Sequence, residues 1–186
     1  DVKTGWGKSI EIDPGVQTSS GIESESEFPQ IAFDSYGNAV VVWKQVSDKK
    51  YGGIWTNLYQ LNKGWQDAGP VSNKNSWQTE ARLAVASTGT ACVVWAQTGG
   101  VAASFYHTKT GWSSPELIHQ DNRNYGEYAP KIAVDDQDRF VVLWVHELKY
   151  FSSFWSIVYT EKEGWAKAVL VMRDFASSDT PELELD

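Results

Sequence analysis

The stretch PQIAFDSYGNAVVVW, residues 29–43, returns as ARLAVASTGTACVVW at residues 81–95 and as PKIAVDDQDRFVVLW at residues 130–144. A shorter copy of its first part, PELELD, occupies residues 181–186. These copies start 52, 49 and 51 residues apart, and the dipeptide Gly-Trp alternates with them, beginning at residues 5, 64, 111 and 164. A period of this size, built from short strands, is typical of β-propeller blades. The repeat therefore predicts an all-β chain made of similar sheets.

Each repeat contains four runs of β-branched and aromatic residues bounded by turn residues, a pattern that predicts four antiparallel strands. In the first repeat three strands are expected over residues 31–34, 39–45 and 54–61, and the fourth follows Gly64-Trp65 and runs to about Ser72. Gly37 lies where a tight hairpin requires a positive φ. The predicted fold is a β-propeller of four-stranded antiparallel blades, with three complete blades over about 29–72, 81–119 and 130–172.

The repeat also predicts orphan strands at both ends, over residues 6–12 and 181–186. The first matches the fourth strand of a blade and the second matches a first strand. The two could pair in one terminal blade. Alternatively, residues 1–186 are a segment of a larger propeller, and the remaining blades come from a longer chain or from a partner chain, since an open array exposes sheet edges that proteins normally cover.

The tryptophans divide into those that belong to the repeat and those that do not. Seven occupy positions of the repeat and are expected to pack between neighbouring sheets, where large flat side chains bury much area. They are residues 6, 43, 65, 95, 112, 144 and 165. Trp55 and Trp155 are equivalent on the third strand, where Ala102 takes the matching place. Trp77 stands outside the pattern, so packing does not explain it.

The pattern Pro-x-Ile-Ala-x-Asp-x-x-Gly-Asn-Ala-x-x-x-Trp, followed by a strand with Tyr near its end and then Gly-Trp, resembles the tandem β-propeller repeats of large secreted or surface-anchored bacterial proteins of mostly unassigned function. Its first half is also similar to NHL-repeat propellers, and Asp34-x-x-Gly37 followed by Trp43 is a weak relative of the sialidase Asp-box. The departures are Ala81 and Ala86 in the second repeat and Asp138 in the third. The resemblance implies a secreted or cell-surface location and no catalytic residue.

Composition excludes several classes of function. The net charge of −8, with 16 Lys and Arg against 24 Asp and Glu, argues against a nucleic-acid partner, whose phosphates require a basic surface. No apolar run approaches the length of a membrane span. Cys92 is the single cysteine and lies within a strand, which supports neither a disulfide nor a metal site. The acidic turn at residues 135–138 occupies a hairpin position, so no metal and no cofactor is expected.

Loop lengths indicate which end of the blades carries function. The turns from first to second and from third to fourth strand share one end and are tight, whereas the other connections share the opposite end and vary, as binding loops on a rigid scaffold do. Aromatic rings beside carboxylates and amides suit a sugar ring. The candidate ligand-binding residues at that end are Trp77, Glu80, Tyr125, Glu127, Tyr128, Tyr51, Tyr150, Gln45, Gln97 and His146. The alternatives are that the rings cap the blades, and that Gln45, Gln97 and His146 hydrogen-bond to the backbone at the strand ends.

Three classes of function remain open. The first is a non-catalytic module that binds a glycan or a protein. The second is a catalytic propeller of the glycoside hydrolase or lyase kind, although no nucleophile elbow, phosphate loop or zinc motif occurs, and the four arginines, residues 82, 123, 139 and 173, do not predict the cluster that a sialidase-type site needs. The third is a structural spacer. The sequence favours the binding module and identifies no catalytic residue.

Overall fold

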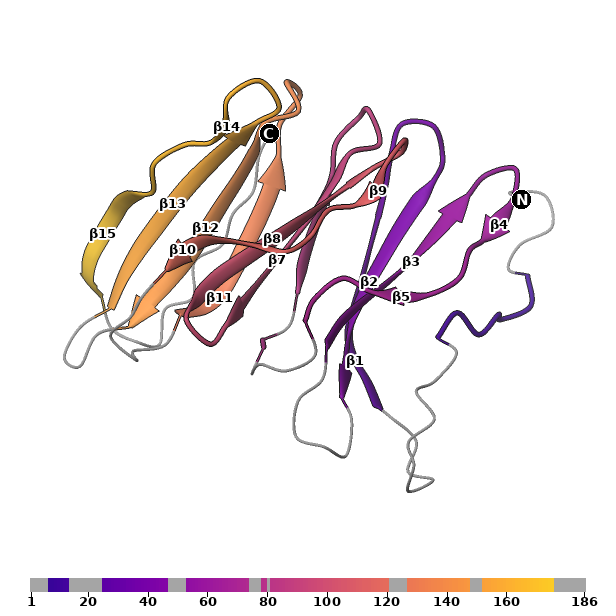
Figure 1. The fold of residues 1–186 in the computed structure, drawn as a ribbon, viewed down its shortest axis with the longest axis horizontal. Coiled ribbons are helices and arrows are strands. Elements are labelled where there is room, and N and C mark those ends of the chain that lie inside the picture. Colours follow the sequence, from indigo (N-terminus) through magenta and orange to yellow (C-terminus); the bar gives the residue numbers. More distant parts are fainter. Residues whose placement is uncertain are drawn as a thin grey trace.

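The structure is a computed structural model that describes residues 7–13, 25–46, 53–73, 78–79, 81–120, 127–147 and 152–175. Within these ranges every regular element is a strand and none is a helix. Figure 1 shows the strands gathered into three antiparallel sheets that stand side by side in chain order. The all-β class predicted from the sequence is therefore confirmed.

Sheet 1 has the strand order β1-β2-β3-β4, with β5 also pairing with β3. Its strands are β1 (Glu25–Phe33), β2 (Ala39–Val46), β3 (Gly53–Gln60), β4 (Gly64–Trp65) and β5 (Gly69–Pro70). Sheet 2 contains β6 (Arg82–Val85), β7 (Ala91–Gln97), β8 (Gly100–His107), β9 (Gly111–Trp112) and β10 (Glu116–Gln120). Sheet 3 contains β11 (Glu127–Val134), β12 (Phe140–Glu147), β13 (Ser152–Thr160), β14 (Gly164–Trp165) and β15 (Val169–Phe175). Each sheet thus has four strand positions, and the fourth is filled by two strands: a two-residue strand at Gly-Trp and a second of two, five or seven residues in sheets 1, 2 and 3.

The strand register confirms the equivalences read from the repeat. Trp43 pairs with Trp55, Trp95 with Ala102, and Trp144 with Trp155. The tyrosine near the end of the third strand pairs with the Gly-Trp tryptophan in every sheet: Tyr59 with Trp65, Tyr106 with Trp112 and Tyr159 with Trp165. The same positions are therefore paired in all three sheets, with Ala102 in sheet 2 at the place of Trp55 and Trp155.

The first strands of sheets 1 and 3 are longer than the sequence predicted. β1 begins at Glu25 and β11 at Glu127, because a register shift between Glu27 and Gln30, and another between Tyr128 and Lys131, let both strands continue past a proline. An irregularity of this kind accommodates the proline, which has no N–H for the ladder. In sheet 2 the corresponding part is a single bridge between Gln78 and Gln97.

Residues 7–13 show no strand pairing, so the orphan strand expected over 6–12 is not formed in its described part. This segment instead lies against sheet 1, where Asn57 Nδ2 donates a hydrogen bond of 3.1 Å to the Ile12 carbonyl. The second expected orphan strand, residues 181–186, lies outside the described residues.

The two ends of the sheets differ in their connections. At the turn end, the first and second strands are joined by residues 34–38, 86–90 and 135–139, and the third and fourth by residues 61–63, 108–110 and 161–163. These turns have equal lengths in all three sheets. At the loop end, β2–β3, β7–β8 and β12–β13 are joined by residues 47–52, 98–99 and 148–151, and the sheets are joined by residues 71–81 and 121–126. The loop-end connections are unequal, as predicted.

Each sheet has a leading face, which carries the second-strand tryptophan, and a trailing face on the other side. The trailing face of sheet 1 packs on the leading face of sheet 2 through Val42 and Ile54 on one side and Val93 and Trp95 on the other. The trailing face of sheet 2 packs in the same way on sheet 3, where Trp144 is central. Trp43, Trp95 and Trp144 are at most 3% exposed, which confirms that these tryptophans are buried packing residues. The first strands also adjoin, since β6 contacts β1 and β11 contacts β6.

Candidate functional site

Gln45 and Gln97, two candidate ligand-binding residues, hold the repeat tryptophans in place. Trp43 Nε1 donates a hydrogen bond of 2.7 Å to Gln45 Oε1, and Trp95 Nε1 donates one of 2.8 Å to Gln97 Oε1. A buried indole N–H without a partner costs free energy, so each amide stabilises its sheet. At the loop end these two side chains therefore act as a support. Gln45 Nε2 also donates a hydrogen bond of 3.5 Å to the Glu25 carbonyl, so for Gln45 the expected bond to the backbone is present as well.

His146 occupies the same place in sheet 3 and has different surroundings. Its side chain is buried, while Trp144 Nε1 is buried with no hydrogen-bond partner among the described residues. His119, from β10 of sheet 2, lies over both: its ring centroid is 5.1 Å from that of Trp144 and 6.0 Å from that of His146. Trp155, the register partner of Trp144, also stacks on His119, with the ring centroids 6.0 Å apart. Sequence analysis missed His119, because it follows Gly111-Trp112 at a position where the other repeats carry no histidine.

Gln78 and Thr79, in the connection that precedes sheet 2, are held by hydrogen bonds at the loop end. Gln78 is buried, accepts a hydrogen bond of 2.8 Å from Ser72 Oγ and donates one of 2.7 Å to the Asn73 carbonyl. Thr79 is joined to Ala96 by two further bonds, Thr79 N to the Ala96 carbonyl and Ala96 N to Thr79 Oγ1. These contacts fix the chain directly beside position 77.

The remaining candidates are only partly covered by the structure. Glu127 and Tyr128 lie on β11 and are register partners of His146 and Val145, so Glu127 and His146 meet at the loop end of sheet 3. Trp77, Glu80, Tyr125, Tyr51 and Tyr150 lie outside the described residues. The structure thus brings together Glu127 and His146 at backbone level.

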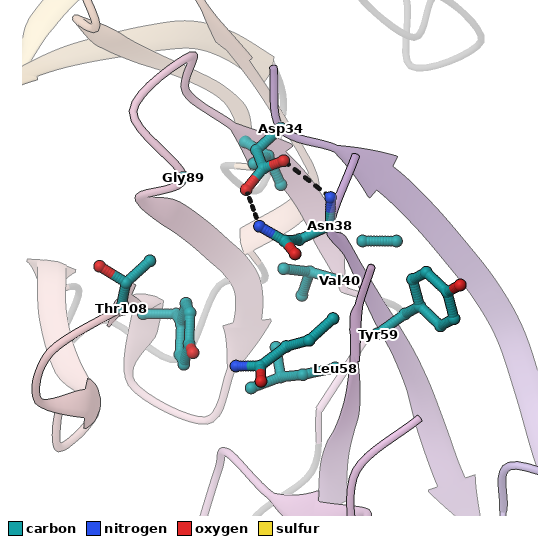
Figure 2. Close-up of a pocket in the computed structure, with 11 residues that line it drawn as sticks. Asp34, Asn38, Val40, Leu58, Tyr59, Gly89 and Thr108 are labelled. Atoms are coloured by element: carbon teal, nitrogen blue, oxygen red, sulfur yellow. Dashed lines mark hydrogen bonds between the residues drawn. The ribbon is translucent and has the colours of Figure 1, made fainter. Parts of the chain in front are cut away.

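A small pocket lies at the turn end between sheets 1 and 2, and Figure 2 shows it. Its accessible volume is about 40 Å³, enough for a few water-sized molecules. Asp34 accepts hydrogen bonds from the backbone N–H groups of Tyr36 and Asn38 and from Asn38 Nδ2, at 2.9, 2.8 and 2.7 Å. Gly89 and Thr108 face this carboxylate from sheet 2. The Asp34 carboxylate therefore stabilises the turn that follows it.

The equivalent cleft between sheets 2 and 3 is larger, with a volume of about 350 Å³. It is bordered by the 135–139 turn, where the Asp135 carboxylate accepts bonds from Gln137 N, Arg139 N and Arg139 Nε. These bonds, above all the one from the Arg139 backbone N–H, lower the pKa of Asp135 below its usual value. Asp138 adopts a positive φ of 58°, and its carboxylate accepts bonds of 3.1 Å from both Ser87 N and Ser87 Oγ in sheet 2. The acidic turn thus joins two sheets.

Other reactive or ligating groups are few in the part of the chain that the structure describes. Cys92 is fully buried in the core between sheets 2 and 3, and burial, with a smaller contribution from Glu116, raises the pKa of its thiol well above the usual value. A protonated, inaccessible thiol is not a nucleophile. Among the described residues, no three His, Cys, Asp or Glu side chains are grouped so as to hold a metal ion. The same residues contain no helix that is long and apolar enough to span a membrane.

Comparison with known proteins supports the fold. No family model matches the sequence, and no curated protein matches it either. Among solved structures, the chain is similar to the Hadza microbial sialidase Hz136, with a TM-score of 0.57 and 12% sequence identity. The match covers 77% of this chain and 38% of that chain. The chain has a β-propeller-like fold.

Proposed function

We propose that this chain is a non-catalytic binding module of a secreted or cell-surface protein, and that it recognises a glycan or a protein through the loop end of its sheets. The observation that carries the proposal is the contrast between the two ends. The turn-end connections have the same lengths in all three sheets. Those at the loop end differ in length; the shortest comprises residues 98–99 and the longest residues 71–81. Variable connections on a rigid scaffold are where binding residues concentrate.

Hydrogen-bonded side chains lie beneath the loop end. Gln45 and Gln97 lock the tryptophans of sheets 1 and 2, and Gln78 and Thr79 anchor the connection that contains position 77. Trp77 is the first choice for ligand contact, because it has no counterpart in the other repeats. Glu80, Tyr125, Glu127, Tyr128, Tyr51 and Tyr150 supply the rings and carboxylates that stack on a sugar and bind its hydroxyls.

A catalytic role of the sialidase kind has less support. The likeness to Hz136 concerns the fold, and the described arginines do not converge. Arg82 is on the first strand of sheet 2, Arg139 is in a turn at the turn end, and Arg173 is on the outermost strand of sheet 3. A cluster of arginines is what a substrate carboxylate would need.

The test is a glycan-array and calorimetric comparison of the wild-type chain with Trp77→Ala. We expect the variant to keep its melting temperature and to lose about 1–3 kcal/mol of binding free energy, as for a stacking anchor. Tyr36→Ala is the matched control, because Tyr36 is an exposed aromatic residue at the turn end. A binding loss equal in both variants, or a large loss of stability in Trp77→Ala, would contradict the proposal. Release of product from a fluorogenic sialoside would instead identify an enzyme.

A further inference from the structure

The trailing face repeats the same positions in all three sheets. One is the residue before the second-strand tryptophan: Val42, Val94 and Leu143. Another is the sixth residue after the Gly-Trp tryptophan: Val71, Ile118 and Val171. In sheets 1 and 2 these residues pack against the next sheet; Val42 and Val94 are fully buried and Val71 is 5% exposed.

In sheet 3 the same face is open. Val171 is 59% exposed, and its neighbours on β15, Val169 and Met172, are also exposed. Leu143 and Phe154 are only half-buried. In Figure 1, β15 lies at the outer edge of the third sheet, with no described strand beyond it. Three neighbouring large apolar side chains left in solvent, one of them at the position of the core residue Val71, indicate an interaction surface.

The way a sheet docks on this kind of face is shown twice in the molecule. The first strand of the docking sheet presents two apolar residues, which pack against the core shared with the sheet before it. They are Leu83 and Val85 in β6, and Ile132 and Val134 in β11. β6 contacts the first two strands of sheet 1, and β11 contacts the first three strands of sheet 2. In PELELD, Leu183 and Leu185 hold the same two positions.

We propose that the trailing face of sheet 3 is the docking surface for a fourth sheet of this same repeat, with residues 181–186 as its first strand. Leu183 and Leu185 contact β11 and β12, and the outer strands of the fourth sheet cover Val171. The partner is thereby specified by its chemistry: an aliphatic pair on the first strand and a tryptophan-bearing leading face.

A second copy of the chain fits this surface less well. The second copy would have to dock through the leading face of its sheet 1. Residues 7–13 already lie on that face, where the Ile12 carbonyl accepts the hydrogen bond from Asn57. Ile12 is the sixth residue after Trp6, so it stands at the position of Val71 and Val171 in the repeat. Docking of a second copy would require this segment to leave.

The first experiment measures hydrogen exchange of the full chain. The double variant Leu183→Asp/Leu185→Asp is compared with Glu182→Gln/Glu184→Gln, whose side chains fall on the other side of an extended strand. We expect amide exchange in β11 and β12 to rise about tenfold in the aspartate variant and not in the control, because docking of the strand is lost. The melting temperature checks that both variants fold. Equal exchange in the two variants would overturn the proposal.

The second experiment supplies a fourth sheet by fusion. Residues 35–72 are fused after Asp186, so that PELELD continues into a second, third and fourth strand taken from sheet 1. In this fusion we expect a thiol placed by Val171→Cys to react with a thiol reagent at least about tenfold more slowly than in the 186-residue chain. Cys92 is buried and gives little background. Unchanged reactivity would refute docking, and a dimer of the 186-residue chain that Phe33→Asp dissociates would assign the surface to a second copy instead.

Discussion

The interface between sheets 1 and 2 and that between sheets 2 and 3 use the same positions with different side chains. In the first, the leading face of sheet 2 offers Ala91 and Ala102 beside Trp95. In the second, the leading face of sheet 3 places Phe140 and Trp155 at those two positions, beside Trp144. Phe105 meets this larger surface, with ring centroids 5.6 Å from Phe140 and 4.1 Å from Tyr159. The repeat therefore conserves which positions touch, while the volume at each position is free to vary as long as the two faces fit.

The largest effect should come from removing the central tryptophan of either interface. Trp95→Ala and Trp144→Ala should each lower the free energy of unfolding by about 3–5 kcal/mol, because both side chains are fully buried and leave a large cavity. Urea denaturation measures both. If the comparison holds, the two losses are similar; a loss below about 1 kcal/mol at one site would show that its interface does not stabilise the fold.

A smaller loss of stability is expected from a substitution at the turn end of the interface between sheets 1 and 2. Gly89 has φ of +87°, and a Cβ there would stand 3.2 Å from Asp34 Oδ2 and 3.3 Å from Thr108 Cγ2. Gly89→Ala should cost about 1–3 kcal/mol from the positive φ and the close contacts together. Gly64→Ala is the control, because Gly64 has a similar φ of +79° and no atom near its Cβ. An equal thermal destabilisation in both variants would mean that contact across the interface contributes nothing.

The second interface tolerates a side chain at the place equivalent to Gly89. There Asp138 adopts the positive φ, and its carboxylate is hydrogen-bonded to Ser87. The larger cleft at this turn leaves room for that side chain, which explains how the third repeat can depart from glycine.

The indole N–H provides a finer comparison. Trp95→Phe should cost about 1 kcal/mol more than Trp144→Phe, because it removes the bond from Trp95 Nε1 to Gln97, whereas Trp144 Nε1 has no hydrogen-bond partner within the described ranges. Calorimetric unfolding of the two variants measures the difference. Adding Gln97→Ala to Trp95→Phe should then have little further effect; a full additional loss would argue against the hydrogen bond as the cause.

The smallest effect concerns pH at the turn of the second interface. The pKa of Asp135 is lowered in the folded state, so its ionised form stabilises the fold above the unfolded-state pKa, and this contribution is lost as pH falls through the lowered folded pKa. Asp135→Asn should therefore be less stable than wild type near neutral pH, and the difference should vanish in acid. Asp136→Asn, with the same change of charge, is the control. A difference that persists at low pH would show that the carboxylate charge is not responsible.

Much of the scaffold could be predicted from the sequence. Gly-Trp and the turn after the first strand recur at similar intervals, and turn chemistry and strand alternation are local properties. The four strands of each sheet and the equivalence of Trp55 with Trp155 could therefore be predicted from them. The irregularities that lengthen β1 and β11 were not predictable, because they depend on pairing with a strand that follows in the chain.

Tertiary structure alone decided the roles of individual polar residues. Gln45 and Gln97 are spaced like a row of ligand contacts, and only the fold shows that each accepts a buried indole N–H. His119 meets Trp144 and Trp155 because two sheets stack, which no local spacing encodes. By itself, the sequence determined the repeating unit and its turns, since these depend on neighbours in the chain. Which faces are covered, from the buried Val71 to the exposed Val171, was decided by the packing of whole sheets, since burial depends on what lies opposite.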